Sequence, residues 1–585
     1  MTQKAFRWIS PGVALQAALA FLLLAVLRPP EIHPQVRAAF GLLVPLSLLS
    51  CLAAGRRAAA RFEAALPFLA GCAGFLAING SLALQQHGAI VAAERLALAA
   101  AAFFVFRELA DEPSLIAGRR LDGRTSVFLA LAAAGCAASL VALWQWTYGF
   151  QRMAEAVPET GFPFREEVLA RLASGRVFGT LLLPGSLAGL LGLTLPVTLS
   201  FALRADDGGV RRGWGRKSAV VGAVVLQGAA LAASGSLAGS AALLLAAGAT
   251  GWLAARSRTS KLVLASGAAL IGIGSIAAAA HWRGIHWMNL SDPAHPAGQR
   301  LGNWIAGLRM LAERPLLGAG GGGYAALYPF YRQPWMNESR HAHNCYLELA
   351  VDYGPLALAA VLLFLVSACR SWLRACRSGP AAAAAAVGVP AFLLHNAVDF
   401  TAYQPGILVP FAALAGAIWA GPSGAQPQGA IHKRPLRASL AAILIAAAGF
   451  LAMHAVADGF CDLLLERAEE LKAQGDIAGA LGALRGAGRL SPLNPSPPAR
   501  EAALLLGSGD PREALSAARR ASRLDPRSGA LQYLVGSALL KAGDPAQAYV
   551  RLACAERLYP MHSDYTNARR QLEERIEQAG KEAER

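Results

Sequence analysis

Residues 346–369 read YLELAVDYGPLALAAVLLFLVSAC, a stretch in which apolar side chains dominate. A helix needs about 20 mainly apolar residues to cross the hydrocarbon core of a bilayer, so this stretch predicts a membrane-spanning helix. Similar runs recur along most of the chain and give about thirteen predicted spans. The predicted spans are 11–27, 37–54, 64–84, 89–106, 126–147, 181–203, 218–234, 236–255, 261–280, 346–369, 381–399, 405–421 and 437–457.

The composition agrees with a protein that is solvated mainly by lipid. Of the 585 residues, 55% are hydrophobic and 16% are charged, whereas soluble proteins average about 45–50% apolar and 25% charged residues. The net charge of +17 comes largely from short basic clusters between the apolar runs. Such clusters orient a chain in the bilayer, so membrane lipid is an expected partner and nucleic acid is not.

The basic clusters also predict an orientation. All of the compact ones fall on one side if the N-terminus is cytoplasmic, which agrees with the excess of Lys and Arg in cytoplasmic loops. The longer connections 148–180 and 281–345 then lie on the opposite side, together with the C-terminal end. We therefore predict a multi-pass protein of the bacterial inner membrane with a periplasmic C-terminal domain.

The connection 281–345 is unusually long for a loop between packed helices, and such loops usually have a function. Its His, Arg and Glu side chains are groups that bind anions or move protons. A solvated periplasmic loop with ordinary polar residues is the alternative that composition leaves open. The residues concerned are His281, His286, His295, Arg300, Arg309, Arg314, Glu338, Arg340, His341 and His343.

An internal repeat occupies the C-terminal end. Gly475, Gly509 and Gly543 are each followed by Asp and recur every 34 residues, with Ala, Leu and Pro positions in the same register. The Gly-Asp pair makes a turn and caps the next helix, and Pro ends each unit. The pattern resembles tetratricopeptide repeats, whose concave surface binds a protein or peptide. A passive lid over the membrane part is the alternative.

The most informative polar pattern lies between Arg300 and Gly354. Its first part has the apolar spacing of an amphipathic helix, with Leu301 and Leu308 on one face, and the glycines at 320–323 then break it. These glycines serve either a flexible segment or a donor-binding turn. The second part enters the span near residue 346 and places His343 at the membrane boundary, where the head group of a lipid-linked substrate would lie.

This pattern resembles the O-antigen ligase superfamily, which includes O-antigen polymerases and protein O-oligosaccharyltransferases. The resemblance spans about residues 90–421 and is most specific in the long loop. The family signature of His-Asn, a Leu and a later Gly is preceded by an Arg, a Trp, a Pro and paired Gly, and further elements lie on both sides. The matching residues are His343, Asn344, Leu347 and Gly354; Arg300, Trp304, Pro315, Gly318 and Gly320; Arg176, Gly179, Thr180 and Pro184; and 395–400.

One position departs from the family. Many members carry Ser-Arg-Gly where this chain reads Ser234, Gly235 and Ser236. A cation that the family places near the donor pyrophosphate is therefore missing there. Arg176 and Arg283 are the candidates to replace it.

The resemblance implies an inverting transfer of a glycan from a polyprenyl pyrophosphate donor to an acceptor hydroxyl. It implies no metal and no cofactor, because the lipid-linked glycan is itself a substrate. The acceptor is lipid A core, a growing polysaccharide or a protein. The implied fold is an all-α membrane bundle of about 12–13 spans, similar to the polyprenyl-dependent (GT-C) glycosyltransferases, with the repeat domain appended.

The chemistry of such a transfer suits particular residues. Arg300 and Arg340 are the first candidates for binding the pyrophosphate, since a guanidinium offers fixed donors and never deprotonates. His343 is the candidate general base for the acceptor hydroxyl. Asn344 is expected to orient the ring or the acceptor, and His341 is a plausible helper.

Other polar residues are expected near the site. Trp304, His395 and Asp399 are candidates for supporting the catalytic residues, with a structural polar pair as the alternative for His395 and Asp399. Glu94 and Arg95 lie next to each other in a predicted span, and we expect them to neutralise each other.

The predicted organisation has three parts. Residues 1–436 form the glycosyltransferase-like membrane domain with the periplasmic loop 281–345, residues 437–457 form the final span, and residues 458–585 form the periplasmic repeat domain. A membrane transporter of a small solute is the rival function, but a transporter places paired ionisable groups near the bilayer midplane rather than in an outward loop. Ligase, polymerase and protein glycosylation are not separated by the sequence.

Overall fold

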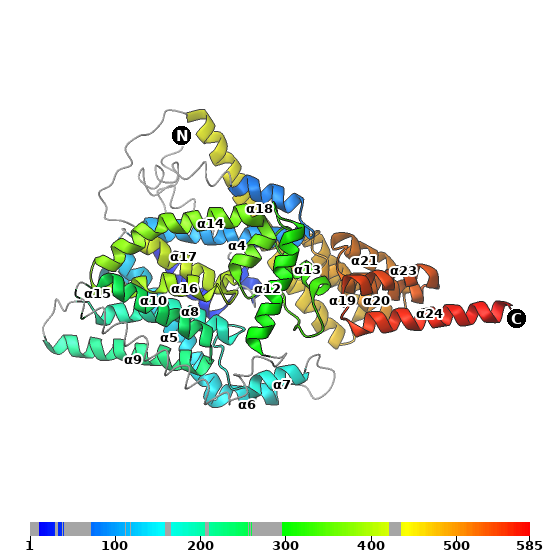
Figure 1. The fold of residues 1–585 in the computed structure, drawn as a ribbon, viewed down its shortest axis with the longest axis horizontal. Coiled ribbons are helices and arrows are strands. Elements are labelled where there is room, and N and C mark those ends of the chain that lie inside the picture. Colours follow the sequence, from blue (N-terminus) through cyan, green and yellow to red (C-terminus); the bar gives the residue numbers. More distant parts are fainter. Residues whose placement is uncertain are drawn as a thin grey trace.

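A bundle of long apolar helices adjoins a stack of shorter helices at the C-terminal end (Figure 1). Helices dominate the described structure, which confirms the predicted all-α class. The exception is a hairpin in which β1 (Pro113–Ile116) pairs antiparallel with β2 (Arg119–Asp122). The computed structural model describes residues 11–29, 33–37, 39, 72–110, 113–116, 119–157, 165–204, 210–255, 257, 259, 295–419 and 434–584.

Most helices of the bundle coincide with predicted spans. The loop that follows the undescribed residues contributes α12 (Pro296–Glu313) and α13 (Gly323–Tyr331), and η3 (Thr401–Tyr403) precedes α17. The helices of the bundle and its outer connection are α1 (Pro11–Leu27), α4 (Gln86–Leu109), α5 (Gly123–Trp144), η1 (Gln145–Gly149), α6 (Phe150–Glu155), α7 (Arg165–Ala173), α8 (Pro184–Ala202), α9 (Val210–Ser234), α10 (Leu237–Ala254), α14 (Cys345–Arg377), α15 (Pro380–Ala386), α16 (Gly388–His395), α17 (Pro405–Trp419) and α18 (Arg434–Ala473).

Seven helices of the described part are long and apolar enough to cross a membrane. They lie in α4, in α5 with its continuation to Glu155, and in α8, α9, α10, α14 and α18. Shorter apolar helices occupy the predicted spans 11–27, 381–399 and 405–421. The polytopic helical bundle is therefore confirmed. The predicted span 261–280 and most of 37–54 lie outside the described residues, so the count of about thirteen stays a prediction.

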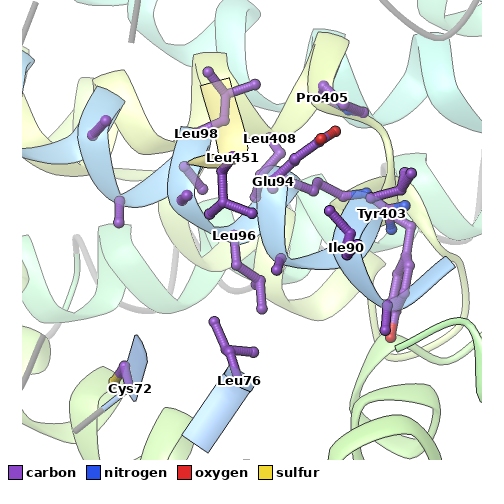
Figure 2. A pocket seen from close by; sticks show the side chains of 18 of the residues that line it. Cys72, Leu76, Ile90, Glu94, Leu96, Leu98, Tyr403, Pro405, Leu408 and Leu451 are labelled. Carbon is purple, nitrogen blue, oxygen red and sulfur yellow. The ribbon is translucent and has the colours of Figure 1, made fainter. Parts of the chain in front are cut away.

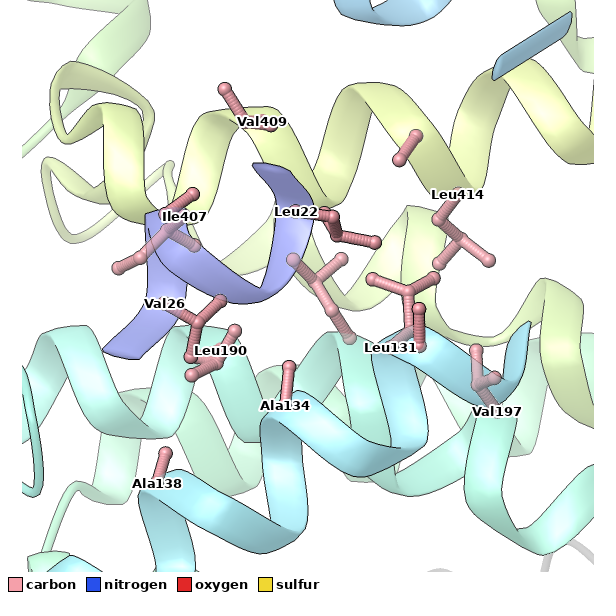
Figure 3. Close-up of a cluster of buried hydrophobic side chains, with 14 of the residues drawn as sticks. Leu22, Val26, Leu131, Ala134, Ala138, Leu190, Val197, Ile407, Val409 and Leu414 are labelled. Carbon is pink, nitrogen blue, oxygen red and sulfur yellow. The ribbon is translucent and has the colours of Figure 1, made fainter. Parts of the chain in front are cut away.

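The core of the bundle lies where α5 packs against α1, α8 and α17 (Figure 3). Ala134 and Ala138 of α5 are fully buried at this contact. Small residues of this kind let helix backbones approach closely, which is how helices associate when lipid removes the hydrophobic contrast. Fully buried larger side chains fill the remaining space, and they include Leu22, Leu131, Leu190, Val197, Ile407 and Leu414.

The last helix of the bundle continues into the C-terminal stack. Helix α18 runs without a break from residue 434 to residue 473, across the predicted boundary at 457/458. Each helix after it packs on its neighbour in the chain. These helices are α19 (Ile477–Leu490), α20 (Ser496–Ser508), α21 (Pro511–Leu524), α22 (Gly529–Lys541), α23 (Pro545–Leu558) and α24 (Ser563–Glu584).

The 34-residue period has a local cause. Asp476, Asp510 and Asp544 cap α19, α21 and α23, each by accepting a backbone N–H three residues ahead. The glycine before each Asp has a φ between 82° and 90°, a left-handed conformation that glycine adopts without steric cost. The Gly-Asp pairs thus end one helix and begin the next, as the sequence predicts. The assignment to tetratricopeptide repeats stays a prediction.

Candidate functional site

His343 lies between the long loop and α14, in a strained backbone conformation. Its φ is 52°, and among the described residues it alone has a positive φ without being glycine. Such a conformation costs free energy and concentrates at functional sites. The indole Nε1 of Trp304 donates to the carbonyl oxygen of His343 at 3.4 Å. Trp304 therefore helps to hold the strained residue, and its role in supporting the catalytic residues stays a prediction.

The surroundings of the His343 imidazole keep it neutral. Burial lowers the pKa of His343 to about 4, and the positive charge of Arg300 acts in the same direction, against the opposing effect of the Asp399 carboxylate. The edge of the ring meets Phe400, with the ring centres 4.9 Å apart. Its Nδ1 is buried and has no hydrogen-bond partner among the described residues. A buried nitrogen without a partner is unusual in folded proteins and marks a position where a further polar group would be satisfied.

His341 is oriented by a carboxylate that the sequence analysis did not identify. Its Nδ1 lies 2.8 Å from Oε1 of Glu348, and Oε2 of Glu348 accepts the backbone N–H of Ala342 at 2.9 Å. The imidazole also stacks on Phe400 with the ring centres 4.2 Å apart. A carboxylate on Nδ1 fixes the tautomer and leaves Nε2 to act on a substrate. An ionisable residue in an apolar span was the available signal for Glu348.

Asn344 begins α14. Its Oδ1 accepts the backbone N–H groups of Tyr346 at 3.1 Å and Leu347 at 3.0 Å. An asparagine side chain at this position satisfies donors that a helix otherwise leaves unpaired. The structure thus gives Asn344 a capping role, and this cap places His343 directly before the first turn of the helix. Its predicted role toward the acceptor stays a prediction.

The glycines at 320–323 form an ordered turn that is fixed to α14. The fully buried Asp352 accepts the backbone N–H groups of Gly322 at 3.1 Å and Tyr324 at 2.9 Å. Backbone bonds from Ala319 and Gly320 reach the carbonyl oxygens of residues 351 and 352. A packed turn, rather than a flexible segment, is therefore what these glycines build. Asp352 is a second carboxylate in the span that the sequence analysis did not identify.

The signature glycine, Gly354, serves close packing. It interrupts the helical conformation of α14 with a φ of 83° and a ψ of 164°. A Cβ at this position would lie 2.0 Å from the carbonyl oxygen of Leu316. The signature leucine, Leu347, packs against Gly307 of α12. These two residues therefore fix the loop to the span.

His395 and Asp399 lie close to each other, with His395 Nε2 3.4 Å from Asp399 Oδ2. Helix α8 approaches them through glycines: a Cβ on Gly185 would lie 2.7 Å from Asp399, and one on Gly189 would lie 3.1 Å from His395. Asp399 influences His343 electrostatically. Whether the pair supports catalysis or is a structural polar pair is not decided by this geometry, and the supporting role stays a prediction.

Arg176 lies against the segment that departs from the family pattern. Its Nε donates to the carbonyl oxygen of Ser234 at 3.0 Å, and a Cβ on Gly235 would lie 3.3 Å from the same nitrogen. Buried Gln145 holds the turn that follows Arg176, because its Oε1 accepts from Phe178 and Gly179 and its Nε2 donates to the Gly179 carbonyl. Gln145 carries no motif in the sequence and was not predicted.

The remaining candidate arginines are placed differently. Arg300 lies in the first turns of α12 and acts electrostatically on His343. Arg340 is exposed and lines a large cavity. Arg283 lies outside the described residues, as do His281 and His286. The structure thus brings Arg300, Arg340 and the two histidines to one end of α14.

The cavity beside Arg340 has a volume of about 2160 Å³, above the range of about 300–1,000 Å³ that is usual for small-molecule sites. Its walls come from the 72–81 helix, α4, α14, α17 and α18. Apolar side chains dominate this lining, and Glu94 and Tyr403 are among its polar groups (Figure 2). Such a cavity accommodates a long apolar chain.

One expectation about neighbouring residues is corrected. Glu94 and Arg95 do not pair with each other: Glu94 lies 2.5 Å from His454 Nδ1, and the Arg95 guanidinium lies over the Tyr403 ring at 5.1 Å. Consecutive helical residues point in different directions, which prevents the pairing.

The apolar face of α12 is largely exposed, unlike that of a helix that faces a protein core. Leu301 and Leu308 are 53% and 57% exposed, whereas the small residues Gly302 and Ala306 are buried. In a membrane protein, small residues make helix contacts and larger apolar residues can face lipid.

Comparison with known proteins adds the family to this geometry. No curated protein matches the chain. Residues 222–362 match the model of the O-antigen ligase family, and the matched region contains Arg300, Trp304, His341, His343 and Asn344 but neither Arg176 nor His395. The match supports glycan transfer of the ligase or polymerase type, with a lipid-linked glycan donor and an acceptor. Residues 222–362 are therefore similar to the O-antigen ligase family, and they belong to a helical chain whose described part holds seven helices long and apolar enough to cross a membrane.

Proposed function

We propose that this protein transfers a glycan from a polyprenyl pyrophosphate to an acceptor hydroxyl, with inversion at the anomeric carbon and without a metal. The reaction takes place at the periplasmic face of the inner membrane. The observation that carries the proposal is His343, a strained and half-buried residue at the loop end of α14. Its Nδ1 is buried without a partner among the described residues, and its lowered pKa keeps the imidazole neutral.

His343 acts as the general base. The acceptor hydroxyl donates to its imidazole and passes its proton there as the oxygen attacks the anomeric carbon. The bond between that carbon and the pyrophosphate oxygen breaks on the opposite face, and the pyrophosphate leaves with the bonding electrons. His341, held by Glu348, orients the acceptor beside the base.

Arginines stabilise the leaving pyrophosphate. Arg300 and Arg340 bind its oxygens, since guanidinium groups aimed at developing negative charge lower the barrier to transfer. Arg176 supplies the cation that the family carries where this chain has Gly235. Its side chain already lies against Ser234 and Gly235.

The apolar cavity takes the polyprenyl chain of the donor. Arg340 and Tyr403 line it, and the Tyr403 ring lies 5.5 Å from the His341 ring. A lipid chain in this cavity would therefore end beside the histidines. The acceptor belongs to lipid A core, a growing polysaccharide or a protein, and the repeat domain holds the acceptor or an assembly partner.

The test compares cells and purified protein that carry the wild type, His343→Ala or Arg300→Ala. The matched control is His562→Ala, which removes an imidazole of the repeat domain. We expect both site variants to accumulate in the membrane, to leave the acceptor unmodified and to lower the transfer rate by about 10²- to 10⁴-fold. Normal transfer by His343→Ala at normal abundance would exclude this mechanism, and unchanged glycans without the protein would favour a transporter.

A further inference from the structure

Two histidines and an aspartate meet outside the glycan-transfer site, where α4 packs on α18. His87 lies in the first turn of α4, and His454 and Asp458 lie on α18. One potential ligand atom from each residue falls within 4.8 Å of the other two. Residues four apart on a helix share a face, so α18 presents His454 and Asp458 together toward His87.

The contact with Glu94 favours the His454 tautomer that a metal ligand needs. Its Nδ1 lies 2.5 Å from Oε1 of Glu94, so the carboxylate accepts the Nδ1 proton and Nε2 keeps its lone pair. This Nε2 is buried and has no hydrogen-bond partner within the described part of the chain. A carboxylate behind the outer nitrogen is the arrangement that orients histidine ligands in metal sites.

His87 offers a second uncommitted imidazole. Its Nδ1 is buried without a partner among the residues that the structure describes, and its Nε2 lies 3.7 Å from Oδ2 of Asp458. The rings of His87 and His454 are tilted toward each other with centres 5.7 Å apart. Two half-buried imidazoles, each with a buried nitrogen that lacks a partner, therefore lie beside a carboxylate. These are polar groups that a ligand would satisfy.

The net charge around the cluster is negative and favours a bound cation. Arg37 contacts three carboxylates: it hydrogen-bonds to Asp458 and Asp462 and lies 3.6 Å from Glu94. One guanidinium against three carboxylates leaves two formal negative charges within this group. A divalent cation balances them, and a carboxylate has lone pairs enough to accept from Arg37 and bind a metal as well.

We propose that His87, His454 and Asp458 bind a divalent transition-metal ion, with zinc as the best fit. Two imidazoles and one carboxylate suit zinc, and three protein ligands with an open fourth position form a known zinc arrangement. Ligand atoms in a tetrahedral site lie about 3.4 Å apart, so closing the site needs side-chain shifts of about 1 Å.

The metal would cross-link the start of α4 to α18. Through Asp458 it would also stabilise a contact with the turn between α19 and α20. Asp458 is fully buried, and its Oδ1 accepts from Ser491 Oγ at 2.7 Å in the turn between α19 and α20. The site therefore ties the membrane bundle to the first repeat unit. Its three ligands take no part in the transfer chemistry proposed above, although Glu94, which orients His454, also lines the proposed donor cavity. Metal binding is measured directly, so the two inferences are tested separately.

The experiment measures metal in the full-length protein, purified in detergent without a histidine tag. After treatment with chelator, the protein is dialysed against zinc chloride, and bound zinc is counted by mass spectrometry. We expect about one zinc ion per chain in the wild type and a higher melting temperature in the zinc-loaded than in the chelator-treated protein. Cobalt(II) in place of zinc should give the visible absorption bands of a tetrahedral site.

The variants His87→Ala and His454→Gln should lose this zinc and the rise in melting temperature. His562→Ala should keep both, and its ring nitrogen also lacks a partner among the described residues. Glu94→Gln should retain the site with about 10- to 100-fold weaker affinity, as for other groups that orient a histidine ligand. If wild-type protein binds no zinc, or if both cluster variants bind as much as wild type, the proposal is overturned. Should a variant fail to fold, the chelated and reloaded wild type still decides the question.

Discussion

Glu348 joins two parts of the loop that the sequence shows only as neighbours: its Oε1 lies 2.8 Å from His341 Nδ1, and its Oε2 accepts the Ala342 N–H at 2.9 Å. The side chain of Glu348 is almost fully buried. One carboxylate from the first turn of α14 therefore fixes both the ring and the backbone of the segment that ends in the strained His343. A site whose donors are held in advance gives up little free energy when substrate binds.

Glu348→Gln should therefore lower the rate constant for transfer without weakening donor binding. A glutamine has one acceptor oxygen, so either the His341 ring or the Ala342 N–H loses its partner. An unmatched buried group costs about 1–3 kcal/mol, which corresponds to a loss of about 5- to 150-fold in kcat. The measurement is kcat and donor KM with purified protein. Because His341 and Glu348 act as one unit, Glu348→Gln combined with His341→Ala should lose little more than either single variant; fully additive losses would contradict this coupling.

The lowered pKa of His343 should appear in the pH profile of the free enzyme. A general base works in its neutral form, and burial lowers the pKa of His343 to about 4. The imidazole therefore stays neutral as the pH falls through about 6.5, where an ordinary histidine takes up a proton. We expect kcat/KM to show no loss from this residue between about pH 8 and pH 5 and to fall only near pH 4. A limb near 6.5 that disappears in His343→Ala would contradict the buried, neutral base.

Gly354→Ala should destabilise the protein more than a change in backbone conformation alone. Gly354 and Gly475 have nearly equal φ values of 83° and 82°, but a new Cβ would lie 2.0 Å from the Leu316 carbonyl oxygen at Gly354 and in open space at Gly475. Gly475→Ala should cost about 1–3 kcal/mol for the left-handed conformation, and Gly354→Ala should cost more because backbone must move. Melting temperatures of the two variants in detergent test this, and equal losses would contradict the packing role of the signature glycine.

Arg176 gives a swap experiment at the position where the chain departs from the pattern of the family that it resembles. If its guanidinium replaces the missing family cation, Arg176→Ala should lower transfer, and adding Gly235→Arg to that variant should restore part of it. The restoration will be incomplete, because Gly235 has a φ of 59° that an arginine adopts only with strain. The readout is donor KM and kcat for the single and double variants. If the double variant is no better than Arg176→Ala, the two positions do not serve the same anion.

The sequence predicts the spans and the loop signature well because both depend on local patterns. Apolar length identifies a helix in lipid whatever its neighbours are, and the pattern from His343 to Gly354 brings its own helix cap and kink. The partners of these residues were harder to predict. Gln145 lies far from the Gly179 turn in the sequence and has no motif, so only the packing of η1 against that turn reveals it.

Other features could not be predicted because an apolar sequence pattern does not show what covers it in the folded protein. The spacing of Leu301 and Leu308 predicts an apolar face on α12 correctly, but it does not say whether protein or lipid covers that face. The buried face instead combines the small residues Gly302, Ala306 and Gly307 with Asn303 and Met310, and the small residues let neighbouring helices approach closely. Glu348 and Asp352 are visible in the sequence as carboxylates in an apolar span, a reliable sign of function or tight pairing, but the sequence does not show which groups they contact.

The repeat domain is docked on the loop that precedes His341, and this contact leads to the last prediction. The hydroxyl of Tyr559 donates to Glu338 Oε1 at 2.5 Å and accepts from Arg332 Nη1 at 2.8 Å, which ties the end of α23 to the segment after α13. Tyr559→Phe removes both bonds and leaves the ring in place. With each bond worth about 0.5–1.5 kcal/mol, the loop should open more often.

Hydrogen exchange of residues 332–340 measures this opening directly. We expect faster exchange in Tyr559→Phe, together with lower transfer, because the same loop carries Arg340 and ends at the histidines. Tyr549→Phe is the matched control, since its hydroxyl bonds to Glu573 inside the repeat domain and not to the loop. Faster exchange with unchanged transfer would mean that the repeat domain merely covers the loop. Equal exchange in the two variants would mean that the Tyr559 contacts do not hold the domain in place.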